Sequence, residues 1–327
     1  MNHTVAVAQR TTLTFDDVLR AAEAIGAHLP PTPAWSYPAL NATAGCEVLV
    51  KHENMQPTGA FKVRGGLALA AAMPPEELAR GLVTASTGNH AQSIAFAARL
   101  AGTEAVIVVP ETAPAGKVEA VRLLGATVIT FGPSMTEAAQ HARELALTRG
   151  LVFVDPGNTP AIIAGHATVY LELLTSRPDL QAVYVPVGSG SGAAGACLVR
   201  DRLAPDCRVI GVQSAAAPAA HRSWKSGRIE SAPCHTRHSG LATGSGFELP
   251  QSILGYGLHD FLLVDDDAID DAASVLAHKA HTLAEGAGAA ALAGLLSDTG
   301  RPERCAVICT GGNASDAELV ALGARSA

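Results

Sequence analysis

Short runs of β-branched and apolar residues alternate with alanine-rich helical runs through the middle of this chain, and no other feature restricts its possible folds as much. The runs that read as buried strands are 81–86, 105–109, 127–131 and 151–154. The helical runs between them are 90–102, 115–125 and 134–150. Two of these helices end in a glycine directly before the next strand, at Gly102 and Gly125, which is typical of a left-handed helix cap. The alternation predicts a βαβ series, and therefore a parallel sheet flanked by helices.

A second alternation follows in the C-terminal half. Its predicted elements are a helix at 160–176, a strand at 182–187, a helix at 193–204, and strands at 208–213 and 305–310. Residues 226–250 are rich in glycine, serine and proline and read as a long loop, and such a loop in an α/β chain is more often functional than idle. We therefore expect an α/β protein with two open twisted sheets flanked by helices.

Length and composition limit the classes of function. At 327 residues the chain suits one large α/β unit or two domains of ordinary size. Its net charge of −7 is spread out, without a run of lysine and arginine, which argues against a nucleic-acid partner. Its 6 cysteines form no CxxC pair, a pattern typical of reduced cytosolic proteins. Residues 1–15 lack a signal-peptide pattern and no apolar run reaches about 18 residues, so we expect a soluble cytoplasmic protein that does not enter membranes.

A strand breaks into alternating glycines and then opens a helix in "VPVGSGSGAAGACLVRDRLA" (185–204). Backbone N–H groups at such a helix start form an anion site suited to phosphate. Gly190, Gly192 and Gly195 also satisfy the G-x-G-x-x-G pattern of dinucleotide-binding oxidoreductases. However, the next strand ends in Gln213 and Ser214, where an NAD site needs an acidic residue, so we favour another phosphate ligand over NAD. A glycine-rich turn without a ligand is the remaining alternative.

Polar groups also crowd the start of a second predicted helix, in "ASTGNHAQ" (85–92). Ser86, Thr87, Asn89 and His90 surround Gly88 and leave free N–H donors for a carboxylate. Taken alone, the segment is equally consistent with a well-capped helix.

One lysine stands out for its surroundings. Lys62, in "TGAFKVRGG" (58–66), is followed by an apolar stretch, and desolvation lowers the pKa of a lysine toward the neutral amine that forms Schiff bases or takes protons. As an isolated residue it would be an ordinary surface lysine. Thr310, in "CTGGNAS" (309–315), offers a neutral hydroxyl where the last strand stops.

Together and in this order, these segments resemble the serine/threonine dehydratase family of fold type II pyridoxal-phosphate enzymes, which share the architecture of tryptophan synthase β and include serine racemase. The resemblance covers nearly the whole chain. The segment "KHENMQPTGAFKVRGG" is similar to the family pattern K-x-E-N-x-Q-x-x-x-[SA]-F-K-x-R-G, a long and specific match. "STGNH", "GSGSG", "AEGAGA" and "CTGGN" resemble further family motifs.

The resemblance implies that pyridoxal 5′-phosphate is the cofactor and that Lys62 forms a Schiff base with it. Phe61 then packs beside the cofactor, Asn89 bonds its 3′-oxygen, Glu285 lies near its ring and Thr310 faces its pyridine nitrogen. The phosphate cradle and the neighbouring loop are implied to be Gly188, Ser189, Gly190, Ser191, Gly192 and Gly240. The residues implied to surround the substrate are Ser86, Thr87, Gly88, Asn89 and His90.

The resemblance implies a lyase that converts a 3-hydroxy amino acid such as L-threonine or L-serine to a 2-oxo acid and ammonia, with Lys62 as general base. Thr87 stands where serine racemase has a serine that acts as the opposite-face base, so Thr87 is a second catalytic candidate and racemisation stays an alternative. Ser239 replaces a usual acidic residue, which leaves phenylserine, 3-hydroxyaspartate or a hydroxyectoine-derived compound open as substrate.

The resemblance also sets expectations for metal, domains and assembly. Relatives with a stimulating divalent cation carry an acidic residue at the position of Gln213, and the 12 histidines have no HExxH spacing, so we expect no metal. A large cofactor domain (1–80 and 159–327), a small domain (81–158) and a homodimer are expected.

Overall fold

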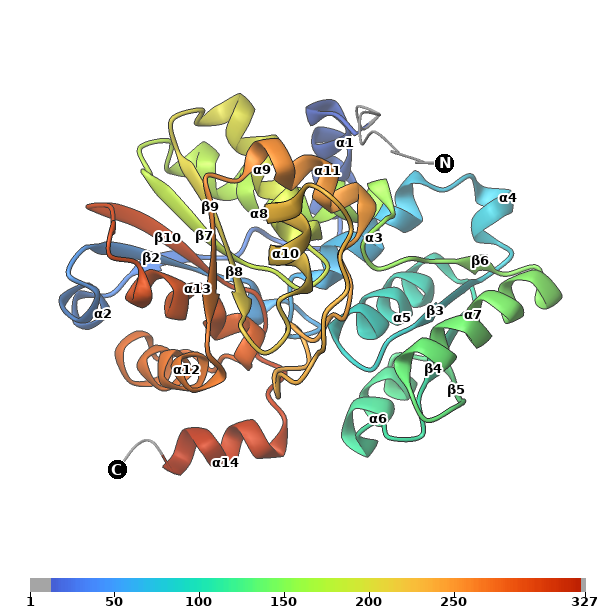
Figure 1. The fold of residues 1–327 in the computed structure, drawn as a ribbon. Coiled ribbons are helices and arrows are strands. Elements are labelled where there is room, and N and C mark those ends of the chain that lie inside the picture. The colour runs from blue at the N-terminus through green and yellow to red at the C-terminus, as the bar shows by residue number, and fades with distance from the viewer. Residues whose placement is uncertain (1–12, 325–327) are drawn as a thin grey trace, which may run out of the picture.

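Two sheets, each flanked by helices, organise the computed structural model, which describes residues 13–324 (Figure 1). The strands are β1 (Ala34–Ser36), β2 (Glu47–His52), β3 (Leu82–Ala85), β4 (Ala105–Val109), β5 (Thr127–Thr130), β6 (Val152–Phe153), β7 (Ala182–Pro186), β8 (Arg208–Ser214), β9 (Asp260–Val264) and β10 (Arg304–Cys309). The helices are α1 (Phe15–Gly26), α2 (Pro38–Ala44), η1 (Glu53–Met55), α3 (Lys62–Ala72), α4 (Pro75–Leu78), α5 (Asn89–Ala101), α6 (Ala115–Leu123), α7 (Met135–Arg149), α8 (Pro160–Ser176), α9 (Ser191–Leu203), α10 (Ala219–Ser226), α11 (Glu248–Gly257), α12 (Asp266–Ala280), α13 (Gly286–Ser297) and α14 (Asp316–Ala324).

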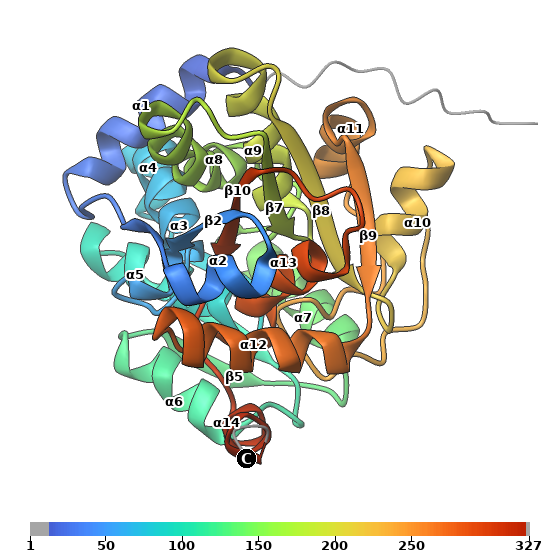
Figure 2. The same ribbon diagram turned by 90° about the vertical axis from the view of Figure 1, so that its left-hand side faces the viewer.

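The larger sheet has six strands in the order β1-β2-β10-β7-β8-β9, all parallel except for the β1–β2 pair. Its strands are buried on both faces, as near-continuous apolar runs predict. In β2, for example, Val48 and Val50 belong to the core beneath α2, α12 and α13, whereas Leu49 faces the core under α1, α3, α8 and α9. Figure 2 shows α2 and α12 side by side on their face of this sheet.

The smaller sheet has four parallel strands in the order β5-β4-β3-β6. One core packs it against α5 and α6, and a second core packs its other face against α7. These elements form the cyan and green lobe at the right of Figure 1. The exact domain boundaries predicted from the sequence stay a prediction.

Most predicted elements are confirmed, two of them with identical bounds, β4 and α8. Gly102 and Gly125 have the positive φ expected at helix ends, 67° and 91°. The predicted loop 226–250 is wrong at its C-terminal end, because α11 already begins at Glu248. Pro250 lies in the first turn of α11, where a missing N–H costs no hydrogen bond, so this proline does not interrupt the helix.

The prediction made for residues 1–15 falls mostly on residues 1–12, which lie outside the described residues. Within 13–324, no helix is both long enough and apolar enough to cross a membrane.

Candidate functional site

A cavity of about 700 Å³ lies between the two sheets, and every residue that the sequence analysis assigned to a site lines it. The polar segments follow the carboxyl ends of β3, β7 and β10, which is where open α/β sheets bind ligands. These residues are Phe61, Lys62, Ser86, Thr87, Gly88, Asn89, His90, Gly188, Ser189, Gly190, Ser191, Gly192, Gly240, Glu285 and Thr310. Segments more than 200 residues apart in the sequence therefore meet in one site.

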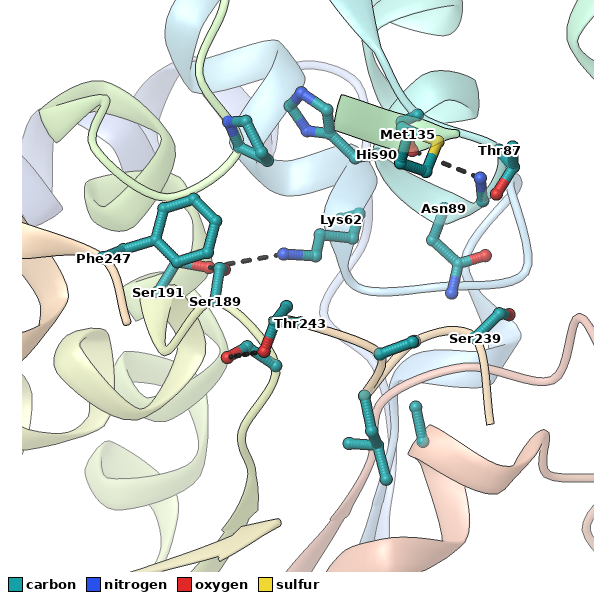
Figure 3. A pocket seen from close by; sticks show the side chains of 18 of the residues that line it. Lys62, Thr87, Asn89, His90, Met135, Ser189, Ser191, Ser239, Thr243 and Phe247 are labelled. Carbon is teal, nitrogen blue, oxygen red and sulfur yellow. Dashed lines mark hydrogen bonds between the residues drawn. The ribbon is translucent and has the colours of Figure 1, made fainter. Parts of the chain in front are cut away.

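Lys62 begins α3 and is half-buried in the cavity wall. Its Nζ donates to Ser191 Oγ at 3.3 Å, the dashed line that joins these residues in Figure 3, and lies 5.0 Å from the centre of the Phe61 ring. Within residues 13–324 no carboxylate lies within ion-pair distance of this amine. Burial alone lowers the pKa of Lys62 to about 8. The cavity thus holds an amine that is partly neutral near neutral pH.

A buried charge network holds α3 in place behind Lys62. Arg64 has no exposed surface; it donates to Glu53 at 2.8 and 2.9 Å and to Glu172 of α8 at 2.6 and 3.0 Å. Lys51 also donates to Glu172. In addition, the carbonyl of Lys62 accepts a hydrogen bond from Ser93 Oγ of α5. The network therefore fixes the first turn of α3, which carries the amine.

The glycine-rich loop before α9 leaves space and donors for an anion. Gly190 is the N-cap residue and has φ 89°, a left-handed conformation that favours glycine. A Cβ on Gly188 would lie 2.6 Å from the carbonyl oxygen of Gly240, so only glycine fits there. The first N–H groups of α9 have no partner within the helix. This loop can hold a phosphate group against the helix start.

The β3–α5 loop presents donors on the other side of the cavity. Asn89 donates to Glu285 Oε1 at 2.5 Å and accepts from Asn313 at 2.8 Å, which leaves one amide hydrogen for a ligand. His90 Nε2 lies 3.2 Å from Thr84 Oγ1, and burial lowers the pKa of His90 to about 3, so the imidazole is neutral.

Two further predicted residues lie at the floor of the cavity. Burial raises the pKa of Glu285 to about 7, although the hydrogen bond from Asn89 opposes this shift. Thr310 donates from its hydroxyl to the carbonyl of Ala287 at 3.1 Å, so toward the cavity it offers a neutral oxygen.

Several lining or bridging residues could not be predicted from the sequence. Met135, Arg143, Phe153 and Phe247 also line the cavity, and none belongs to a motif. Lys117 of α6 donates to Ser239 at 2.7 Å and so connects the smaller lobe to the loop near the cavity. A single histidine in the apolar α8 run was the only available signal for the contact between His166 and Ser191.

The described residues contain no group of three or more histidine, cysteine, aspartate or glutamate side chains that could hold a metal ion. At the position where the resemblance places a cation ligand, the Oε1 of Gln213 accepts from the backbone N–H of His221 at 3.0 Å. The absence of a metal requirement stays a prediction.

Comparisons with known proteins agree with this arrangement. A family described as "Pyridoxal-phosphate dependent enzyme" matches residues 25–311. The chain is 35% identical over 305 residues to an L-threonine ammonia-lyase of Thermotoga maritima, covering 92% of this chain and 76% of that protein. It is 33% identical to an L-threo-3-hydroxyaspartate ammonia-lyase of a Pseudomonas species, covering 91% and 95%. The solved structure of maize serine racemase superposes with a TM-score of 0.90 at 29% identity, covering 97% of this chain and 98% of that one.

Proposed function

Because this chain belongs to the pyridoxal-phosphate-dependent enzyme family, we propose that it is an ammonia-lyase acting on a 3-hydroxy amino acid such as L-threonine or L-serine. The products are a 2-oxo acid and ammonia. In the net reaction the β-hydroxyl leaves as water, and a second water is taken up when ammonia is released.

One observation carries this proposal most directly: an amine with a lowered pKa and no carboxylate partner faces the ligand cavity. Structural lysines within proteins are normally paired with a carboxylate, as Lys51 is with Glu172. Among the described residues, the hydrogen-bond partner of the Lys62 amine is instead a neutral hydroxyl, that of Ser191. An amine without a carboxylate partner in a partly desolvated site suits covalent and base chemistry, because both need the neutral form.

The residues around Lys62 fit the family's cofactor. Lys62 would hold its aldehyde carbon, the Gly188–Gly192 loop its phosphate, and Thr310, Asn89 and Phe61 its ring. The close approach of Gly188 to Gly240 and the free N–H groups of α9 support the phosphate assignment. Bound pyridoxal phosphate supplies an electron sink that acidifies the Cα proton of an attached amino acid.

The chain's own residues then divide the remaining work. The amine of Lys62 removes the Cα proton, and its pKa of about 8 keeps a useful fraction neutral at physiological pH. The N-terminus of α5, with Ser86 and Thr87, binds the substrate carboxylate through N–H groups that the helix leaves free. His90 is neutral and takes part as a hydrogen-bonding group rather than as a cation.

The side chain of the substrate is the open part of this proposal. Met135, Arg143, Phe153 and Phe247 line the cavity outside the cofactor motifs, so they are candidates for contact with that side chain. The similarity to an L-threo-3-hydroxyaspartate ammonia-lyase keeps a dicarboxylic substrate among the alternatives. Phenylserine and hydroxyectoine-derived amino acids are the others.

A panel of L- and D-3-hydroxy amino acids, scored for 2-oxo acid release, tests the function. The panel contains serine, threonine, 3-hydroxyaspartate and phenylserine. We expect release from at least one L-isomer by the wild type and none by a Lys62→Ala variant. Holoenzyme that releases no 2-oxo acid from any member, nor from a hydroxyectoine-derived 3-hydroxy amino acid, would contradict the proposal.

Racemisation is a second candidate activity, because the hydroxyl-bearing Thr87 lines the same cavity as Lys62 and the fold is similar to that of maize serine racemase. The enantiomeric purity of substrate recovered at partial conversion decides it. Unchanged purity excludes racemisation, whereas a purity that falls in the wild type but not in a Thr87→Ala variant supports it.

Domain boundaries, localisation and oligomeric state are also part of the proposal. We assign the large domain to residues 1–80 and 159–327 and the small domain to residues 81–158, and we expect a cytoplasmic homodimer. Size-exclusion chromatography with light scattering tests the oligomeric state.

A further inference from the structure

His166 is a buried histidine that the proposed reaction leaves without a role. It lies in the middle of α8, has no exposed surface, and packs its ring against Phe61 with ring centres 4.5 Å apart. The other buried side chains of this helix are mostly apolar, so packing alone does not require an imidazole here. His166 differs from an ordinary core residue because it contacts Ser191, the residue whose hydroxyl also contacts the amine of Lys62.

Ser191 is that neighbour, and its oxygen lies at the meeting point of three polar groups. Lys62 Nζ is at 3.3 Å, His166 Nδ1 at 3.0 Å and Ser189 Oγ at 3.2 Å. A hydroxyl has one hydrogen to donate and two lone pairs with which to accept. The direction of that one hydrogen therefore decides how Ser191 acts on Lys62.

His166 is neutral in this environment. Burial first, and then the positive charge of Lys62, lower its pKa well below the ordinary value. The backbone of Lys62 opposes the shift, as a carbonyl beside an imidazole N–H does. The Nε2 of His166 makes no hydrogen bond of ordinary geometry, whereas its Nδ1 faces Ser191. We assign the proton to Nε2, because an N–H there would face the Lys62 carbonyl that opposes the shift, and the lone pair then falls on Nδ1, beside Ser191.

Three other titratable groups lie close enough to affect the pKa of His166. Lys62 and Arg64 belong to α3, and His90 belongs to α5. Arg64 is neutralised by Glu53 and Glu172. His90 is itself neutral because burial lowers its pKa to about 3. The amine of Lys62 is thus the group in this cluster whose charge changes near neutral pH.

We propose that His166 is a positioning residue for Lys62, acting through Ser191. Its Nδ1 accepts the single hydrogen of Ser191, which turns the lone pairs of the Ser191 oxygen toward the amine. An ammonium group has only hydrogens to offer, so this orientation stabilises the protonated form of Lys62, the form produced when the amine has taken a proton. The inference rests on the proposed function, in which Lys62 is the base.

Removal of the acceptor should lower the pKa of Lys62. In a His166→Leu variant the Ser191 hydrogen has lost this acceptor and can turn toward the amine, where it repels the hydrogens of the ammonium group. A lost hydrogen bond to a charged group corresponds to a shift of about one pKa unit. His166→Gln keeps an acceptor oxygen on a flexible stem and should restore most of the wild-type value.

The pH dependence of cofactor uptake measures this pKa without turnover. Apoenzyme is mixed with pyridoxal phosphate between pH 6 and pH 10, and the rate at which the bound chromophore forms is followed by absorbance, because only the neutral amine reacts. We expect a wild-type midpoint near the pKa of about 8 and a His166→Leu midpoint about one unit lower. An unchanged or raised midpoint in a folded His166→Leu variant would overturn the proposal.

A double-mutant cycle shows whether His166 acts through Ser191. Ser191→Ala should lower the midpoint by a similar amount, and adding His166→Leu should then shift it no further. Additive shifts would assign His166 an independent role and contradict the proposal. If His166→Leu does not fold, the same comparison between His166→Gln and Ser191→Ala still applies, because the first is expected to stay near the wild type and the second is not.

His52 provides a matched control. It is also fully buried, but its nitrogens face Tyr37 and Thr282 rather than Lys62 or Ser191. His52→Leu should leave the midpoint unchanged. A shift equal to that of His166→Leu would show that any loss of a buried histidine changes the pKa of Lys62, and would contradict a specific role for His166. A wild type that takes up no cofactor would contradict the proposed function, whereas normal uptake with an unchanged His166→Leu midpoint would contradict this inference alone.

Discussion

Glu53→Gln tests whether the buried network behind Lys62 fixes the first turn of α3. Glu53 has no exposed surface and accepts from Arg64 at 2.8 and 2.9 Å. The network contains two cations, Lys51 and Arg64, and two carboxylates, Glu53 and Glu172. The substitution keeps the shape of the side chain but leaves one buried positive charge without compensation.

Loss of one partner from a buried ion pair costs about 3–5 kcal/mol of unfolding free energy. Unfolding entropy of about 2.1 cal/mol/K per residue gives about 0.7 kcal/mol/K for a chain of 327 residues. The expected fall in Tm is therefore about 4–7 °C. Burial would raise the pKa of Glu53, but Arg64 and Lys51 hold it below the ordinary 4.5. The difference between variant and wild type should accordingly persist down to about pH 4.5 and shrink below it, as the unfolded carboxyl takes up a proton.

Thermal unfolding followed by circular dichroism, with and without pyridoxal phosphate, provides the measurement. Glu104→Gln is the matched control, because it breaks an exposed pair with Arg149 whose side chains are 41% and 43% accessible. Exposed pairs contribute up to about 1 kcal/mol, so this Tm should fall by less than about 1.5 °C. A Glu53→Gln variant that unfolds within that margin at neutral pH would refute the reasoning.

Three other outcomes follow from the site. Gly188→Ala should weaken cofactor binding at least about tenfold in a fluorescence titration, because the added Cβ would lie 2.6 Å from the Gly240 oxygen. Gly255→Ala is the control and should bind the cofactor normally, because a Cβ on Gly255 has nothing within 4 Å. Turnover at saturating substrate should rise with pH through a midpoint near 8, since the lowered pKa of Lys62 makes the amine neutral above that value; a midpoint near the ordinary 10.5 would contradict the burial argument. Treatment with EDTA should leave turnover unchanged, because Gln213 is not a carboxylate and its Oε1 already accepts a hydrogen bond from the His221 backbone. A loss of activity that Mg²⁺ or Ca²⁺ restores would contradict the prediction that no metal is required.

Periodicity and turn residues predicted the parts of the fold that form locally. The strand at 105–109 and the helix at 160–176 have sufficiently long apolar patterns for their bounds to be read directly. The larger sheet was harder to predict, because β10 inserts between β2 and β7 from the far end of the chain. Short strands such as β1 are defined by their partner rather than by their own residues.

The candidate site shows the same division. Motif residues such as Lys62 and Thr310 could be named from the sequence because their glycine-rich or polar context marks them. Contacts that depend on packing between distant helices could not be named. Arg64 meets Glu172 across 108 residues and Lys117 meets Ser239 across 122, and neither pair has a local pattern.

The identity of the lysine that binds the cofactor is the central claim. Borohydride reduction of the holoenzyme, followed by proteolysis and mass spectrometry, locates the bond directly. We expect a single reduced pyridoxal-phosphate adduct on the peptide that contains Lys62. An adduct on Lys51, Lys117, Lys225 or Lys279 instead, or none in protein that has taken up the cofactor, would contradict the account.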